Sequence, residues 1–142
     1  MKIAPLTEPD FSAVITLWKD CGLTRPWNDP EKDMHFAMQG QGSTILVGKL
    51  AGEIVASVMV GHDGHRGVLY YLSAAPLHQG KGFGRAIHDA AIAWLQSKGV
   101  WKVNLLIRND NERVRGFYER LGYIENNAIS FGKVIAANQE ST

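Results

Sequence analysis

The sequence has one cysteine, almost no net charge and no long apolar run. Cys21 is the only cysteine among 142 residues, so no disulfide can form within the chain. Small secreted domains usually depend on disulfides, so this composition favours a reducing compartment, and we expect a cytoplasmic protein. Residues 1–5 lack the apolar core of a signal peptide, and no stretch approaches the roughly 18 apolar residues that span a bilayer. We therefore expect no membrane partner.

Charges of opposite sign nearly cancel over the chain. Fifteen Lys and Arg residues stand against fourteen Asp and Glu residues, a formal net charge of +1 at pH 7. Proteins that bind nucleic acid non-specifically need an excess of positive charge, so nucleic acid is not an expected partner. The histidines lack further His or Cys partners at ligand spacing, so no metal is expected. No repeat or linker divides the chain, and residues 1–142 are predicted to form one domain.

Two helical patterns occupy the first forty residues. Thr7 and Asp10 form a start signal, and apolar residues at three-and-four spacing then predict a helix that ends near Gly22. Its inward positions would be Phe11, Val14, Ile15 and Trp18. The proline-rich residues 25–30 predict a loop, and a short helix with Met34 and Met38 facing inward is expected after it.

Extended segments and helices follow one another in the rest of the chain. Residues 44–50, 54–61 and 68–75 are rich in Val, Ile, Leu or Tyr and are separated by glycine-containing turns, which predicts a meander of three strands. The later elements are expected to be a helix from Phe83 to near Gly99, a strand at 101–107, a helix started by Asn109 and ended by Gly122, and a strand at 128–134. This order predicts helices packed on a sheet with at least one parallel pair of strands.

A glycine-rich loop between a strand and a helix is the most informative motif. Gly80, Gly82 and Gly84 lie within five residues, where the first amide groups of the expected helix have no intrahelical acceptor. The helix dipole is positive at this end, so a phosphate or diphosphate is the expected ligand, with Lys81 and Arg85 as nearby cations. The loop is not a dinucleotide-binding G-x-G-x-x-G, because residue 85 is arginine, nor a phosphate-binding G-K-[ST], because Gly82 follows Lys81.

Residues 79–84, Gln-Gly-Lys-Gly-Phe-Gly, resemble the Gln/Arg-x-x-Gly-x-Gly/Ala signature of the GNAT N-acetyltransferases. The resemblance extends over residues 69–123, including the strand that ends in Ala-Pro and the helix with Asn111 and Tyr118. Segments 25–30, 63–67 and 70–72 resemble the bacterial branch called YpeA. The resemblance implies one α/β (α+β) domain with a mixed, mainly antiparallel central sheet flanked by helices. It also implies an acyltransferase that moves an acetyl group from acetyl-CoA to a primary amine.

The resemblance implies a role for each matching residue. Backbone groups of Leu72, Ser73 and Ala74 would bind the pantetheine arm of acetyl-CoA. Its diphosphate would lie against Gly80, Lys81, Gly82, Phe83, Gly84 and Arg85, with Gln79 at the loop entrance. Asn111 would contact the cofactor arm, and Tyr118 would act as general acid toward the leaving thiolate. The structural alternatives are a helix cap for Asn111 and a core position for Tyr118.

The acceptor site and the general base are less defined. Relatives that acetylate protein amino termini often carry glutamate on the strand before Asn109, where this chain has Leu-Leu-Ile at 105–107. Glu31, Asp33, His62 and His65 are alternative bases that would act through water, and their spacing selects none of them. Candidate acceptor contacts are Arg25, Trp27, Asp29 and His65, each of which could instead be a packing or solvated loop residue.

Three functions therefore stand beside each other. The first is acetyl transfer to a small-molecule primary amine, and the second is transfer to a peptide or protein amino terminus. The third is a non-catalytic sensor of acyl-CoA, against which the presence of Tyr118 argues. The sequence leaves both a monomer and a homodimer open.

Overall fold

The computed structural model describes residues 1–136. Contacts within the chain divide it into two compact units, Met1–Leu105 and Leu106–Thr142. The expectation of one domain over residues 1–142 stays a prediction. Within the part that the structure describes, no helix is long and apolar enough to cross a bilayer.

The first unit is built on a five-stranded sheet in the order β1-β2-β3-β4-β5. Its strands are β1 (Lys2–Pro5), β2 (Ser43–Leu50), β3 (Glu53–His62), β4 (Gly67–Ala74) and β5 (Val103–Asn104). The first four are antiparallel neighbours, and only β4 and β5 run parallel. The predicted meander and the mixed, mainly antiparallel sheet are confirmed. The edge strand β1 was not predicted, because four residues with a single large aliphatic side chain, Ile3, give too short a pattern.

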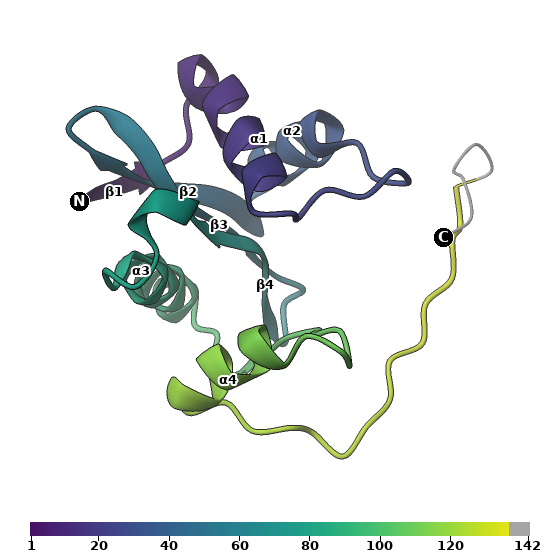
Figure 1. Ribbon diagram of the computed structural model, residues 1–142. Coiled ribbons are helices and arrows are strands. Elements are labelled where there is room, and N and C mark those ends of the chain that lie inside the picture. Colours follow the sequence, from purple (N-terminus) through teal and green to yellow (C-terminus); the bar gives the residue numbers. More distant parts are fainter. Residues whose placement is uncertain (137–142) are drawn as a thin grey trace. The chain divides into compact units, whose positions relative to one another are not determined.

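Helices cover both faces of this sheet (Figure 1). α1 (Phe11–Asp20) and α2 (Pro30–Gln39) pack on one face, and α3 (Phe83–Ser97) packs on the other. Successive side chains of a strand point to opposite faces of the sheet, so β2 is apolar on both. Ile45 and Val47 belong to the core under α1 and α2, whereas Leu46 belongs to the core under α3. All three helices were predicted at these positions, and the short helices η1 (Glu8–Asp10) and η2 (Pro76–His78) precede α1 and α3.

The second unit contains the helix α4 (Glu112–Arg120). The helix was predicted, but its cap is Asn111 rather than Asn109, since the Asn111 side chain accepts a hydrogen bond from the Val114 amide at 3.2 Å. The strand predicted at 128–134 is wrong, because those residues form no strand. A strand must pair its backbone N–H and C=O groups with a neighbouring strand. Residues 106–136 contain no strand, so this unit offers no such partner to residues 128–134. The strand predicted at 101–107 is confirmed only for Val103–Asn104.

Candidate active site

A β-bulge interrupts β4 near its middle. On β3, Ser57 pairs with Ser73 and Met59 pairs with Tyr70. Two residues of β4, Tyr71 and Leu72, therefore lie opposite the single β3 residue Val58. Tyr71 has a φ of 53°, in the left-handed region that non-glycine residues rarely adopt. A bulge leaves one residue out of the ladder and turns the strand, so a peptide group becomes available to a ligand.

Most of β4 has a neighbouring strand on one side only. β5 pairs with β4 only at Gly67 and Val68, so residues 69–74 have β3 on one side and no strand partner on the other within the described chain. Leu72, Ser73 and Ala74, expected to bind the pantetheine arm through their backbone, lie in this segment. Ser73 is buried, and its hydroxyl lies 2.9 Å from the Ser57 hydroxyl, so its side chain is engaged in the core. This stretch of β4 is suited to pair with an extended ligand arm.

The glycine loop ends in a helix start without a side-chain cap. Gly80 and Gly82 have φ values of 81° and 82°, and Gly82 is the N-cap of α3. Gly82 has no side chain, so the N-cap residue provides no cap hydrogen bond to the first amides of α3. A Cβ added to Gly80 or Gly82 would meet no atom within 4 Å, so backbone conformation, not packing, requires glycine at these positions. A helix start without a capping side chain, at the positive end of the helix dipole, fits a diphosphate.

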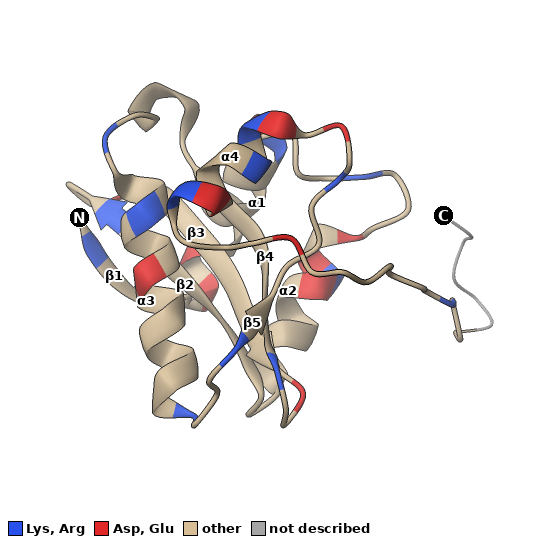
Figure 2. Cartoon of the chain, turned by 90° about the horizontal axis from the view of Figure 1, so that it is seen from below, with Lys and Arg blue, Asp and Glu red and all other residues tan. Residues whose placement is uncertain are grey.

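Local charge supports an anion at this helix start. Lys81 and Arg85 are exposed, and neither forms an ion pair with another residue of the described chain; Figure 2 colours such cations blue. A surface pocket that includes His78, just before the loop, is also lined by Asp20 and Glu53. Two carboxylates would repel a diphosphate, so the glycine loop is the better place for it.

The loop and β4 are tied together at one carbonyl. The Gln79 side chain donates from Nε2 to the Ala74 oxygen at 3.3 Å, and the Cys21 thiol donates to the same oxygen at 3.2 Å. Sequence reasoning missed Cys21, as well as His78, whose buried Nδ1 has no hydrogen-bond partner in the part of the chain that the structure describes. A histidine before a glycine loop and a lone cysteine give no spacing signal that could have identified them.

A buried polar network supports the bulge from behind. The Trp18 indole donates to the Ser57 hydroxyl at 2.8 Å, and the Ser57 and Ser73 hydroxyls lie 2.9 Å apart. The Trp18 ring also stacks on the Tyr71 ring, with centroids 4.0 Å apart and planes 13° apart. Trp18 was predicted only as an apolar core residue. The network fixes both the bulged strand and the side chain of Tyr71.

Tyr71 joins the bulge to a helix on the neighbouring layer. Its hydroxyl donates to Asp33 Oδ2, on α2, at 2.9 Å. Burial, followed by the hydrogen bond to the Asp33 carboxylate, raises the pKa of Tyr71 above its ordinary value. The phenol therefore stays protonated at neutral pH and remains a donor. Sequence reasoning missed Tyr71, because a strand pattern does not reveal a bulge.

Asn111 and Tyr118 belong to the second unit. Tyr118 is 8% exposed and its ring lies edge-on to the rings of Phe117 and Tyr123, with centroids 5.1 Å and 5.2 Å away. Burial, and then the neighbouring Tyr123, raise the pKa of Tyr118 above its ordinary value. The hydroxyl is thus protonated at neutral pH. Asn111 uses its side-chain oxygen as the helix cap, which leaves its amide nitrogen for any other contact.

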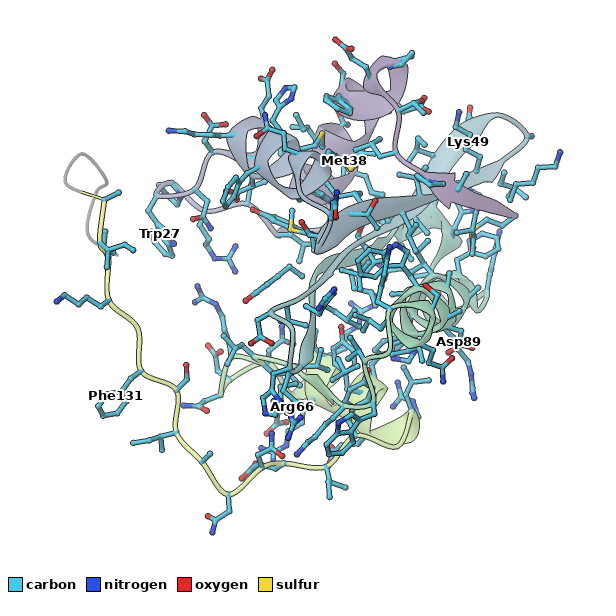
Figure 3. All side chains as sticks on the ribbon, turned by 180° about the vertical axis from the view of Figure 1, so that it is seen from behind. Trp27, Met38, Lys49, Arg66, Asp89 and Phe131 are labelled. Carbon is cyan, nitrogen blue, oxygen red and sulfur yellow. The ribbon has the colours of Figure 1, made fainter. Side chains whose placement is uncertain are left out.

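The four candidate acceptor residues have mainly local contacts. Arg25 donates to the backbone oxygens of Gly22 and Thr24, at 2.8 Å and 2.9 Å. Asp29 caps α2. Trp27, labelled in Figure 3, lies on the loop between α1 and α2 and is 37% exposed. His65 is exposed in the turn after β3. These contacts are explained by local structure, and their roles toward an acceptor stay predictions.

The sequence match to known families decides the class of the protein. Residues 11–123 match the model of the acetyltransferase (GNAT) family. The chain belongs to this family. GNAT acetyltransferases use acetyl-CoA, so the expected class of enzyme, an acyltransferase, and its co-substrate are confirmed. The GNAT match spans both units of the chain, from α1 to the residues that follow α4.

Relatives and solved structures agree with the GNAT assignment. An acetyltransferase of Yersinia enterocolitica is 41% identical over 140 residues, which cover 99% of each chain. An aminoglycoside 6′-N-acetyltransferase from Acinetobacter haemolyticus superimposes with a TM-score of 0.79 at 17% identity, covering 96% of this chain and 100% of that one. The ribosomal-protein-S18-alanine N-acetyltransferase of Escherichia coli gives 0.75 at 23% identity, covering 89% and 79%. At such identities the two structures show the shared fold alone.

Proposed function

We propose that this GNAT enzyme transfers the acetyl group of acetyl-CoA to the nitrogen of a primary amine by direct attack on the thioester. The observation that carries the proposal is the pairing of an uncapped α3 start with a bulged β4 that has lost its second neighbour. The first offers amides to a diphosphate, and the second offers backbone groups to an extended arm. Both belong to the first unit and are joined through Gln79 and Ala74.

The two elements divide the binding of acetyl-CoA between them. Backbone groups of Leu72, Ser73 and Ala74 bind the pantetheine arm in the manner of an added strand. The diphosphate lies against the amides of residues 80–85, and Lys81 and Arg85 supply the opposing charge. A peptide N–H released by the bulge donates to the thioester oxygen, where negative charge develops during attack.

The chemistry then needs one acid for the leaving group. A neutral amine nitrogen attacks the carbonyl carbon, the C–N bond forms and the C–S bond breaks. Tyr118 gives its hydroxyl proton to the thiolate and regains a proton from the acetylated nitrogen, so the products are an amide and a free thiol. The Tyr118 phenol is buried and stays protonated at neutral pH, so its hydroxyl can donate a hydrogen bond to the sulfur as negative charge develops there.

Two measurements test the proposal together. Calorimetry should show acetyl-CoA binding to the folded protein, and an assay of free thiol should show turnover with at least one primary amine from a panel of alkyl amines and peptides. Tyr118→Phe should lower kcat by roughly 100-fold or more while leaving the Kd of acetyl-CoA within about twofold. Absence of acetyl-CoA binding would reject the function, and an unchanged kcat in the variant would remove Tyr118 from the mechanism. The panel also separates small amines from peptide amino termini as acceptors.

A further inference from the structure

Asp33 is a half-buried carboxylate on the side of α2 that faces β4. It lies one residue before Met34, a fully buried core residue, and its Oδ2 accepts the hydrogen bond from Tyr71. A carboxylate can accept several hydrogen bonds, and a single phenol satisfies only one of them. Asp33 therefore retains acceptor capacity at the site of its contact with the bulge.

Two acids of the first unit, Asp10 and Asp33, are partly buried, whereas the others are exposed. Asp10 lies 2.8 Å from the Lys49 ammonium. Asp33 has no such cation among residues 1–136, and its hydrogen-bond partner, the Tyr71 phenol, is neutral. Lys32, the neighbour of Asp33 in the sequence, is exposed and forms no ion pair with another residue of the described chain. A partly buried negative charge without a cation favours a ligand that brings one.

The position of Asp33 is fixed by a chain of contacts that begins in the core. Trp18 is fully buried, stacks on Tyr71 and so limits the directions that the phenol can take. Tyr71 is itself one of the two residues of the bulge. The Asp33 carboxylate is thus separated by one tyrosine side chain from the peptide groups of the bulge, which we assign to the thioester carbonyl. The attacking nitrogen of the acceptor must approach that carbonyl.

We propose that the Asp33 carboxylate binds the ammonium group of the acceptor and accepts a proton from it, with Tyr71 as the residue that positions the carboxylate. The inference rests on the proposed function and adds the acceptor class, which is an alkyl amine that is protonated in neutral solution. It also selects one base from the four alternatives that the sequence left open.

The protons of the proposed step balance. The ammonium nitrogen gives one proton to the Asp33 carboxylate, and the neutral nitrogen attacks the acetyl carbon. The second proton lost by the nitrogen balances the one that the thiolate receives, and the Asp33 carboxylic acid releases its proton to solvent. Carboxylic acids are far stronger acids than alkylammonium ions, so the resting pair is the ion pair, and the proton must move to Asp33 before the nitrogen lone pair can attack.

The other three candidate bases have surroundings that fit less well. Glu31 is exposed on α2, and its hydrogen bond to Asp29 is made by its backbone amide rather than by its carboxylate. His62 accepts a hydrogen bond at Nδ1 from the Gly64 amide at 3.0 Å. His65 is exposed beside Arg66, whose positive charge would disfavour an ammonium. Among the described residues, only Asp33 of the four has a hydrogen bond to the bulge.

The test compares two amines and three variants of the full chain. The amines are 1,4-diaminobutane, which is charged at pH 7, and aniline, which is not. Asp33→Asn keeps the shape and still accepts from Tyr71, Tyr71→Phe removes the positioning hydroxyl, and Glu31→Gln removes an acid two residues away on the same helix as a matched control. Calorimetry with acetyl-CoA and the thermal midpoint are recorded for each protein.

We expect wild-type enzyme to prefer 1,4-diaminobutane. Asp33→Asn should lower kcat/KM for that amine by about 100-fold, with less than about a threefold change for aniline and for the Kd of acetyl-CoA. Tyr71→Phe should raise the KM for the diamine by roughly 5- to 10-fold with a smaller change in kcat. Glu31→Gln should match wild type.

Different failures are distinguishable. Equal activity of Asp33→Asn and Glu31→Gln, or a wild-type enzyme that acetylates aniline at least as well as the diamine, overturns this inference and leaves the proposed function intact. A wild-type protein that does not bind acetyl-CoA overturns both. A Tyr71→Phe variant that lowers the thermal midpoint but not the efficiency toward the diamine assigns Tyr71 a purely structural role.

Discussion

Helices α2 and α3 lie on opposite faces of one sheet, and their first turns are built in opposite ways. Asp29 precedes α2 and accepts hydrogen bonds from the Glu31 and Lys32 amides, at 3.1 Å and 3.2 Å, and Pro30 begins the helix. Gly82 precedes α3 in a left-handed conformation and, having no side chain, provides no cap hydrogen bond to the amides that follow. In α2 the cap residue satisfies two of the orphan donors, whereas at α3 we propose that the diphosphate of acetyl-CoA does so.

The contrast shows what a helix start must give up in order to bind a ligand. A cap such as Asp29 contributes about 1 kcal/mol of stability, and α3 forgoes that contribution. α3 forms nonetheless because Ile87, Ala91 and Leu95 are almost completely buried against the sheet. Packing along the helix thus allows its first turn to be specialised for function. α4, with Asn111 as its cap, resembles α2 in this respect.

The most severe test converts the α3 start into an α2-like one. Gly82→Asp would place a carboxylate where it can accept from the first α3 amides and would repel the diphosphate. The Kd of acetyl-CoA should rise by at least about 100-fold, because the donors are occupied and the charge is of the wrong sign. Titration calorimetry measures the effect.

Gly82→Asn separates charge from capping in that experiment. Asparagine also tolerates the left-handed region and can cap the helix, but it is neutral. Its Kd should lie between those of wild type and Gly82→Asp, roughly tenfold above wild type. If aspartate binds acetyl-CoA as tightly as glycine does, the diphosphate does not lie on this helix start.

A milder change tests backbone conformation without a new polar group. Gly82→Ala introduces a Cβ at a φ of 82°, which costs about 1–2 kcal/mol of strain, and relaxation of the loop should raise the Kd of acetyl-CoA by roughly 5- to 10-fold. Gly99→Ala is the matched control, because Gly99 lies just after α3 with a φ of 86° and similar open space. Both variants should lower the free energy of unfolding by similar amounts, as denaturant titration would show. A rise in Kd shared by both variants would mean that general strain, rather than the loop, controls binding.

Sequence patterns were sufficient for the part of the fold that depends on local periodicity. The apolar spacing after Asp10 and Phe83 predicted α1 and α3, and the glycine spacing at 80–84 predicted a loop before a helix start, whose role in anion binding stays a prediction. These features depend on residues close together in the chain. The strand predicted at 128–134 failed because alternating apolar residues such as Ile129 and Phe131 indicate only a tendency, and a strand also needs a partner.

The proposed role of Asp33 toward the acceptor could not be selected from the sequence for a related reason. The contact between Asp33 and Tyr71 joins residues 38 positions apart, and it depends on a bulge that inserts one extra residue in β4. Neither the distance nor the bulge leaves a periodic signal, so Asp33 remained one of four alternatives. Asp29, in contrast, was predicted as an acceptor contact, although an Asp-Pro pair before a helix is also a typical cap signature.

The smallest expected effect comes from removing the cap of α2. Asp29→Ala should lower the free energy of unfolding by about 1 kcal/mol, because the Glu31 and Lys32 amides lose their acceptor, and the thermal midpoint should fall by a few degrees. Asp29→Ser should retain most of the stability, because a serine hydroxyl can cap the same turn. Neither variant should change the Kd of acetyl-CoA, since the proposed diphosphate site lies at the start of α3. If Asp29→Ser is fully stable but the diamine then shows a severalfold higher KM, Asp29 contacts the acceptor as well, and α2, like α3, has a functional first turn.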